Sequence, residues 1–355
     1  VTALFGIAVL LTVVLEIAAE PVLWLFGASE NTLPYALGYM RIYVAGSVFV
    51  MFTLGLNTFI TTQGFAKSSM KTVLIGAICN IILDPIFIFA LHMGVKGAAL
   101  ATVISQAISA IWVLCFLRGK NTKLRIKKEN LKLQMNILLP VMGLGLAPFV
   151  MNLTESLINI AFNASLSKYG GDVAVGAMTI LASIMQLQFM PVQGLGQGAQ
   201  PLISYNYGAE KIDRVKKTIR ILILSCLVYT LLFWLLVELF PGFFVKLFNN
   251  NSPELYKMTV WALRIYMGMT GIFGIQMAIQ QTFMSLGQAK LSLFIACLRK
   301  IILLIPLIYI LPAFFTDKVF AVFLAEPVSD FISVVVASVL FLLNINKILS
   351  GADRK

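Results

Sequence analysis

The sequence predicts an all-α polytopic membrane protein, and three observations carry that prediction. Of its 355 residues, 59% are hydrophobic and only 12% are charged, whereas soluble domains average roughly 25% charged residues. The mean hydropathy is +0.93. Apolar runs of about 20 residues, the length that spans a bilayer as a helix, recur from one end of the chain to the other. A transmembrane β-barrel would instead show weakly alternating segments of about ten residues.

We expect ten transmembrane helices, one for each apolar run. Their predicted ranges are 3–26, 34–62, 69–92, 95–117, 136–167, 173–205, 217–245, 255–285, 290–312 and 318–345. An even number of spans places both chain ends on one side of the membrane. The predicted domains follow this order: an N-terminal lobe of four helices (1–117), a basic loop between lobes (118–134), a C-terminal lobe of six helices (135–345) and a tail (346–355).

The positive charges predict which side is cytoplasmic. Residues 63–71, 118–134, 206–220, 286–290 and the chain after 345 hold 18 Lys and Arg, while the opposite connections hold five. An excess of Lys and Arg marks cytoplasmic loops, so the first set and the C-terminus are predicted to be cytoplasmic. The basic segment 118–134 suits contact with anionic lipid headgroups. We therefore expect the lipid bilayer, and no nucleic acid, as the partner of these charges.

Motifs of enzymes are missing from the sequence. It contains no Walker A lysine motif, no HExxH and no GxSxG, which hydrolases of ATP, peptides and esters would show. The four cysteines stand singly in apolar runs, without CxxC spacing, and are interpreted as small buried hydrophobes. We expect a protein that is not an enzyme and has no cofactor apart from a coupling ion.

An internal repeat indicates two lobes of the same orientation. Arg41-Ile42-Tyr43 recurs 223 residues later as Arg264-Ile265-Tyr266, and further residues match at the same offset: Gly64, Ala66, Lys67 and Ser69 with Gly287, Ala289, Lys290 and Ser292. The offset covers six helices, so the symmetry axis lies along the membrane normal. The second copy begins near Met135, so we expect that the chain lacks the first two helices of a twelve-helix protein.

Asp84 is the most informative ionisable residue, because it lies deep in an apolar run. Asn80 precedes it by four residues and shares its helix face, while Pro85 bends the helix and frees a backbone carbonyl. These oxygens suit a hard cation, and desolvation favours a protonated carboxyl group, so a proton is equally possible. The repeat places Leu303 and Leu307 opposite Asn80 and Asp84. Because the polar pair belongs to one copy only, we favour an ion site over a structural kink.

A second polar stripe lies in the fifth predicted helix. Glu155 has Asn152 and Asn159 three and four residues away on one helix face, which indicates either a cavity wall or hydrogen bonds to neighbouring helices. Asp330, with Glu326 one turn earlier, matches a glutamine of the first copy, and a bracing role between helices is slightly favoured. Methionines such as Met185 suit an adaptable lining as well as ordinary packing.

A glycine- and glutamine-rich segment ends the sixth predicted helix, GLGQGAQPLISYNYGA at 194–209. Its glycines allow either close helix approach or a broken helix. In the eighth predicted helix Gln276, Gln280 and Gln281 add amide groups within the membrane.

Three segments together resemble a known family: QGFAKSSMKTVLIGAICNIILDPIFIF, SLGQAKLSLFIACLRK and GLGQGAQPLISYNYGAEK. They are similar to the MATE family, the multidrug and toxic compound extrusion transporters, and most to its bacterial MepA-like branch. The resemblance covers essentially the whole chain. It implies twelve helices in two pseudo-symmetric six-helix lobes, and cation-driven export of amphipathic, often cationic, drugs by alternating access.

The resemblance also implies site residues. Some family members bind a cation through an Asn and an Asp of helix five and a Thr of helix six, which Asn80, Asp84 and Thr102 fit. Others use a Glu of helix seven and an Asp of helix ten. Glu155 fits that Glu, whereas helix ten of this chain carries glutamines and no acid.

We therefore expect a monomeric secondary antiporter in the cell membrane that exchanges a drug for Na⁺ or H⁺. The cation would bind at Asp84, Asn80 and Thr102. The drug would contact a second set of residues: Glu155, Asn152, Asn159, Gln281 and Met185. Two alternatives stay open. A flippase for lipid-linked oligosaccharides would need several Arg or Lys for pyrophosphate, and the chain could also be a channel or a non-transporting membrane scaffold.

Overall fold

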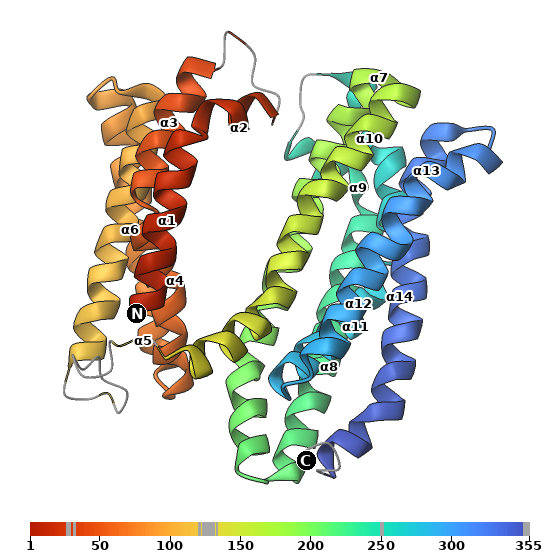
Figure 1. The fold of residues 1–355 in the computed structure, drawn as a ribbon. Coiled ribbons are helices and arrows are strands. Elements are labelled where there is room, and N and C mark those ends of the chain that lie inside the picture. Colours follow the sequence, from red (N-terminus) through yellow and green to blue (C-terminus); the bar gives the residue numbers. More distant parts are fainter. Residues whose placement is uncertain are drawn as a thin grey trace. The chain divides into compact units, whose positions relative to one another are not determined.

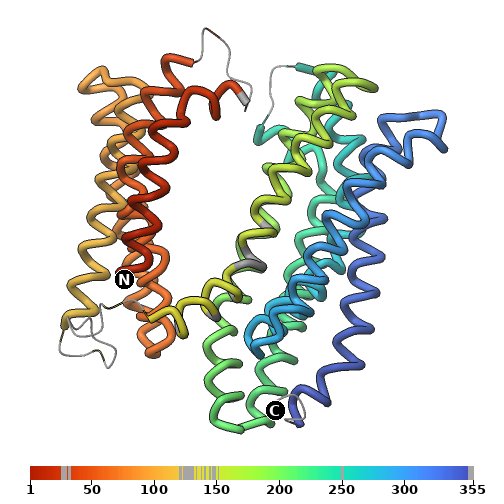
Figure 2. Tube along the Cα trace, in the orientation of Figure 1, coloured from red at the N-terminus to blue at the C-terminus, as the bar shows by residue number. Residues whose placement is uncertain are grey.

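A computed structural model of the chain describes residues 1–25, 30, 33–119, 122, 132, 134–248 and 252–350. Over these residues the chain is helical and contains no strand (Figures 1 and 2). Most of the predicted loop 118–134 and the end of the predicted tail lie outside the described residues. The helices form two compact units, Val1–Leu138 and Leu139–Lys355.

The first unit, red to orange in Figure 1, is built around a central helix that packs against three others. Its elements are α1 (Thr2–Ile17), α2 (Ala19–Leu25), α3 (Leu33–Ala45), α4 (Ser47–Thr62), α5 (Ala66–Pro85), η1 (Ile86–Ala90) and α6 (Gly94–Arg118). The central helix is α6, which contacts α3, α4 and α5. A Cβ on Gly97 would lie 2.7 Å from the Phe87 carbonyl oxygen, so glycine there permits the close approach of α6 to η1.

The helix type changes immediately after Pro85. The α-helix α5 ends at this residue, and the five residues of η1 form a π-helix. Proline cannot donate an N–H, and its ring clashes with the carbonyl one turn earlier. A wider turn accommodates that clash, and π-helical turns are frequent at functional sites. The kink that the sequence predicts at Asp84 and Pro85 thus takes the form of a π-helical segment.

The second unit, yellow to blue in Figure 1, contains the longer helices. Its elements are α7 (Met135–Gly208), α8 (Ile212–Leu239), α9 (Pro241–Lys246), α10 (Pro253–Tyr266), α11 (Thr270–Ser285), α12 (Ala289–Cys297), η3 (Leu298–Leu304), α13 (Ile305–Phe314) and α14 (Lys318–Leu349). α7 consists of two helices that meet at Gly171, where φ is 63° and ψ is −161°. Only glycine adopts that conformation readily, and the sequence predicted separate helices on either side of it.

Four of the helices that the sequence predicted as single are interrupted. The predicted helix 34–62 is bent by 49° between α3 and α4, and 255–285 is bent by 52° between α10 and α11. Gly46 and Gly268 stand at these two breaks, where glycine weakens the helix. The predicted helix 3–26 is interrupted at Ala18, and 217–245 is divided where α8 ends before Pro241, which cannot continue the hydrogen-bond pattern.

The internal repeat reappears as matched helix ends. α4 ends at Thr62 and α11 at Ser285, while α5 begins at Ala66 and α12 at Ala289, so both pairs differ by the 223 residues of the repeat. Gly64 and Gly287 each have a left-handed backbone, with φ of 90° and 76°. The hydrogen bond from Phe65 N to Ile60 O is 3.2 Å long, and its counterpart from Gln288 N to Phe283 O is 2.8 Å.

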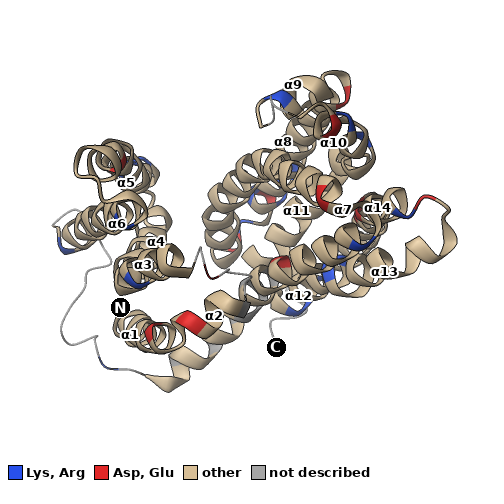
Figure 3. Cartoon of the chain, turned by 90° about the horizontal axis from the view of Figure 1, so that it is seen from above, with Lys and Arg blue, Asp and Glu red and all other residues tan. Residues whose placement is uncertain are grey.

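The described helices are those of a polytopic membrane protein, as predicted. Six are long and apolar enough to cross a membrane, or up to eight if each bent pair is one span. Charged residues are sparse along them when the molecule is viewed from above (Figure 3). This count differs from the predicted ten for two reasons. α1 is too short to be counted, and α7 counts as one span of 57 residues although it contains the break at Gly171. Ten spans therefore stays a prediction.

Candidate functional site

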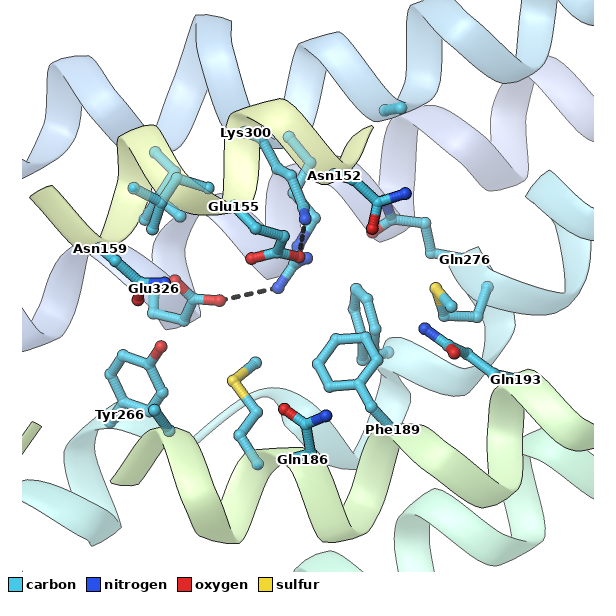
Figure 4. A pocket seen from close by; sticks show the side chains of 18 of the residues that line it. Asn152, Glu155, Asn159, Gln186, Phe189, Gln193, Tyr266, Gln276, Lys300 and Glu326 are labelled. Carbon is cyan, nitrogen blue, oxygen red and sulfur yellow. Dashed lines mark hydrogen bonds and ion pairs between the residues drawn. The ribbon is translucent and has the colours of Figure 1, made fainter. Parts of the chain in front are cut away.

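A cavity of about 450 Å³ lies within the second unit, between α7, α10, α11, η3 and α14 (Figure 4). Aromatic and methionine side chains make up much of its apolar wall: Met178, Met185, Met190, Met277, Phe189, Phe273 and Tyr266. Phe189 and Phe273 meet edge to face with ring centroids 5.0 Å apart. About half of the lining residues are polar or charged, most of them amides. A cavity that combines aromatic surface with polar groups that can orient a ligand suits a small molecule.

Four of the five predicted substrate-binding residues line this cavity. Asn152, Glu155 and Asn159 lie on one face of α7, and Met185 faces them from the second half of that helix. Gln281 lies elsewhere, in an adjoining cavity of about 270 Å³ that shares Glu155 with the first. The role of these residues in binding stays a prediction.

Gln281 is held by a contact between helices. Its Nε2 donates a hydrogen bond of 3.2 Å to Gln200 Oε1 of α7. A Cβ on Gly196 would lie 3.0 Å from the Gln281 side chain, so that glycine brings α7 and α11 together. The glycine-rich segment 194–209 is helical as far as Gly208. A broken helix is therefore wrong, and close helix approach is right for Gly196, whereas a Cβ on Gly194 or Gly198 would meet nothing within 4 Å.

Arg299 joins two helices through a buried ion-pair network. Its Nη2 lies 2.7 Å from Glu326 Oε1 and its Nε lies 2.6 Å from Asp330 Oδ1. The guanidinium also stacks 4.2 Å from the centroid of the Phe273 ring. Arginine suits such a place because its planar fork binds carboxylates and stacks on aromatic faces. The bracing role slightly favoured for Asp330 is thus what the structure shows.

Lys300, the next residue, binds a different carboxylate. Its Nζ forms an ion pair with Glu155 Oε1, drawn as a dashed line in Figure 4. The side chain of Lys300 is only 8% exposed, whereas that of Glu155 is 56% exposed and opens to the cavity. This pair lies beside the Arg299 network, so three acids and two bases form one charge cluster: Glu155, Glu326, Asp330, Arg299 and Lys300.

The π-helix η3 carries both bases of this charge cluster. A π-helical turn shifts the backbone hydrogen bonds by one residue and can leave a carbonyl without a partner in its own helix. Ser329 of α14 donates a hydrogen bond of 2.7 Å to the Arg299 carbonyl. The Arg299 carbonyl of this turn thus accepts a hydrogen bond from α14, the helix that also carries Glu326 and Asp330.

The roles of Arg299 and Lys300 were not predicted from the sequence. The signal that could have found them is charge balance. Two buried bases in one apolar run, and two acids four residues apart in the next, each need a partner in the membrane. Glu326 and Asp330 share a helix face, so a pairing with Arg299 was within reach.

In the first unit, the predicted cation site is partly assembled. Asn80 Nδ2 donates a hydrogen bond of 3.2 Å to Asp84 Oδ1. Thr102 donates instead to the carbonyl of Ala98, at 2.9 Å, within its own helix α6. All three predicted residues are partly buried on two helices, α5 and α6, that pack together.

These groups suit a negatively charged acceptor as they stand, and binding Na⁺ needs a rearrangement. As placed, Asn80 presents its N–H to the Asp84 carboxyl group. To bind Na⁺, Asn80 would have to turn its amide so that Oδ1 faces the ion, since hard cations take oxygen ligands. Among the described residues no group of three His, Cys, Asp or Glu side chains could hold a metal ion.

The fold defines a polytopic α-helical membrane protein with a cavity inside one of its two units. A sequence profile of the MatE family matches residues 1–86 and 148–310. The chain belongs to the MatE family and is a membrane transporter, not an enzyme. The predicted resemblance to MATE transporters of the MepA-like branch is confirmed.

Known relatives agree with this assignment. The multidrug export protein MepA of Staphylococcus haemolyticus is 28% identical over 308 residues, which are 86% of this chain and 67% of that protein. MepA of Staphylococcus aureus (strain MSSA476) is 27% identical over 325 residues, 90% of this chain and 71% of that protein. A crystal structure of MATE in the bent conformation matches with a TM-score of 0.90 at 22% identity, covering 99% of this chain and 78% of that one.

Proposed function

We propose that the protein exports amphipathic, mostly cationic small molecules in exchange for Na⁺ or H⁺, by alternating access. The observation that carries the substrate side is the cavity of the second unit. Its aromatic and methionine wall suits flat apolar molecules, and Glu155 offers a carboxylate that opens to the cavity. The relatives named as multidrug export proteins support the same class of substrate.

The coupling ion is proposed to bind at Asp84. This carboxyl group lies in an apolar helix, hydrogen-bonded to Asn80 and followed by a π-helical turn. Ionisable groups inside a membrane are costly and usually functional. Binding of a cation or a proton would neutralise Asp84 and release the amide of Asn80. The adjacent π-helical turn is a natural place for the helix to change its bend.

The location and orientation of the transporter are proposed from the distribution of its charged residues. We place it in the cell membrane as a monomer, with the basic connections and the C-terminus in the cytoplasm, because 18 Lys and Arg lie on that side and five on the other. Lipid headgroups would then contact the basic segment 118–134.

Transport of lipid-linked oligosaccharides is the main alternative, and one observation bears on it. Arg299 and Lys300 both line the cavity, as recognition of a pyrophosphate would require. Both are, however, already paired with carboxylates. An anionic ligand would have to displace these acids, which favours a cationic substrate. A saturable flux that follows an ion gradient would exclude a channel or a scaffold.

The experiment that tests the proposal is ethidium efflux from right-side-out vesicles carrying Asp84→Asn. Efflux driven by a Na⁺ or pH gradient should fall to the level of vesicles without the protein, because a neutral amide cannot exchange the ion. Asp213→Asn is the matched control, since Asp213 is exposed in the first turn of α8, and should leave efflux unchanged. Gradient-driven efflux at the normal rate in Asp84→Asn vesicles would disprove the role of Asp84.

A further inference from the structure

The charge cluster of the second unit holds more acids than bases. It contains two bases, Arg299 and Lys300, and three acids, Glu155, Glu326 and Asp330. With all five groups ionised, the cluster is one positive charge short. An uncompensated charge in a low-dielectric site is costly, so the cluster has room for one monovalent cation.

Two carboxylate oxygens in this cluster lack partners. Glu326 Oε2 and Asp330 Oδ2 are buried and accept no hydrogen bond within the described part of the chain. Glu326 is 3% exposed and lines the cavity. A buried acceptor without a donor is unfavourable by about 1–3 kcal/mol. Glu326 can therefore accept a second cation beside Arg299.

Lys300 is the base that is able to move. Arg299 is fixed by two carboxylates, by stacking on Phe273 and by the bond from Ser329 to its carbonyl. Lys300 has a flexible four-carbon stem and a compact ammonium group. It forms its ion pair with Glu155 and lines the same cavity as Glu326. Two carboxylates thus border the cavity into which this flexible ammonium group extends.

We propose that Lys300 is a tethered counter-ion that a cationic substrate replaces at Glu155. In the empty cavity the ammonium group of Lys300 neutralises Glu155. When a monovalent organic cation binds, it takes over Glu155, and Lys300 turns to the free oxygen of Glu326. The rings of Phe189, Phe273 and Tyr266 line the same cavity and offer cation–π contacts to the substrate.

This exchange makes Lys300 a specificity-determining residue, and it rests on the proposed function only in that the substrate is a cation. A neutral ligand cannot displace an ammonium group from a carboxylate. An anionic ligand would meet Glu155 and the free oxygen of Glu326. The cavity therefore selects for one positive charge next to aromatic surface.

The test uses tetraphenylphosphonium as the probe and tetraphenylborate as its anionic counterpart. Binding is measured by calorimetry on the purified full chain in detergent. Lys300→Met removes the competitor, so the affinity for tetraphenylphosphonium should rise about tenfold, which is 1.4 kcal/mol, while tetraphenylborate should not gain. Lys257→Met removes the same charge from an exposed position in α10 and should leave both affinities unchanged.

A double-mutant cycle separates exchange at Glu155 from a general electrostatic effect. If Lys300 competes for Glu155, the gain from Lys300→Met should vanish in a Glu155→Gln background. An equal gain in both backgrounds would overturn the proposal, because Lys300 would then act only through its distant charge. Lys300→Arg is the second variant. It should weaken tetraphenylphosphonium binding, since a guanidinium holds a carboxylate with two hydrogen bonds.

The outcomes also distinguish this inference from the proposed function. If the unaltered chain binds no tetraphenylphosphonium, the proposed class of substrate is wrong. If it binds the probe but Lys300→Met and Lys300→Arg bind it with unchanged affinity, the class stands and the exchange at Lys300 is disproved.

Discussion

At the scale of single residues, Arg299 and Lys300 have different roles in the charge cluster. They are neighbours in sequence, yet one is held by four separate contacts and the other by one ion pair to an exposed carboxylate. The first stabilises the packing of η3 against α14, and the second is poised to respond to a ligand. The π-helical turn of η3 brings both side chains to the same cavity.

Replacement of Arg299 should destabilise the protein. Arg299→Met leaves Glu326 and Asp330 as two unpaired buried carboxylates, and loss of one partner from such a pair costs about 3–5 kcal/mol. Thermal unfolding in detergent should therefore begin at a clearly lower temperature. Arg220→Met, at an exposed position of α8, is the control and should melt with the unaltered protein. Equal melting of the two variants would show that Arg299 contributes little to stability.

At the scale of elements, glycines set how closely helices cross. A Cβ on Gly274 of α11 would lie 2.6 Å from the carbonyl oxygen of Cys226 in α8. Thr230 of α8 donates a hydrogen bond of 2.7 Å to the carbonyl of Gly271 at the same crossing. Small residues that let helix backbones approach are the usual basis of packing within membranes.

Gly274→Ala should separate α8 from α11. Because the new methyl group would meet backbone rather than a flexible side chain, we expect a loss of about 1–3 kcal/mol, measured as lower thermal stability. Gly198→Ala makes the same chemical change in α7, where a Cβ would meet nothing within 4 Å. That variant should be as stable as the parent or slightly more so, since alanine favours a helix. A stable Gly274→Ala protein would contradict the close crossing.

The repeat is the element-scale feature that the sequence predicted best. Gly64 and Gly287 match in sequence and share a left-handed backbone, which glycine adopts readily, so the repeated sequence goes with a repeated turn. The bends at Gly46 and near Gly268 were not predicted. Hydropathy is continuous across both, and a bend depends on what the helix packs against, such as Val103 beside Gly46, which sequence periodicity does not reveal.

At the scale of the whole molecule, composition was enough to predict the fold class. The polar stripe on α7 left a cavity wall and hydrogen bonds between helices open, and the structure shows that its residues line the cavity. The rest of the site depends on contacts between helices far apart in sequence. Lys300 meets Glu155, and Arg299 meets Asp330, through packing that no spacing rule describes. Thr102 was predicted to act together with Asp84, but its hydroxyl donates a hydrogen bond within its own helix instead.

The orientation of the whole molecule can be tested with single cysteines in a cysteine-free background. Ala209→Cys lies in the basic connection between α7 and α8, and Thr316→Cys lies between α13 and α14. The excess of positive charge predicts that a membrane-impermeant maleimide added to intact cells labels position 316 and not 209. Everted vesicles should give the opposite pattern. Labelling of position 209 in intact cells would reverse the predicted topology.

The charge deficit of the cluster has a consequence for energetics. With a monocation bound, the site would be electrically neutral, whereas the empty site carries one negative charge. In the proposed exchange, Asp84 is ionised while the substrate is exported and is neutralised by the coupling ion during the return step. With a monocation in the cluster, both steps therefore carry the same net charge, and one-for-one exchange would not depend on the membrane potential. A neutral substrate would leave one more negative charge on the export step, and moving one elementary charge through 100 mV corresponds to about 2.3 kcal/mol, so its transport would be voltage-dependent.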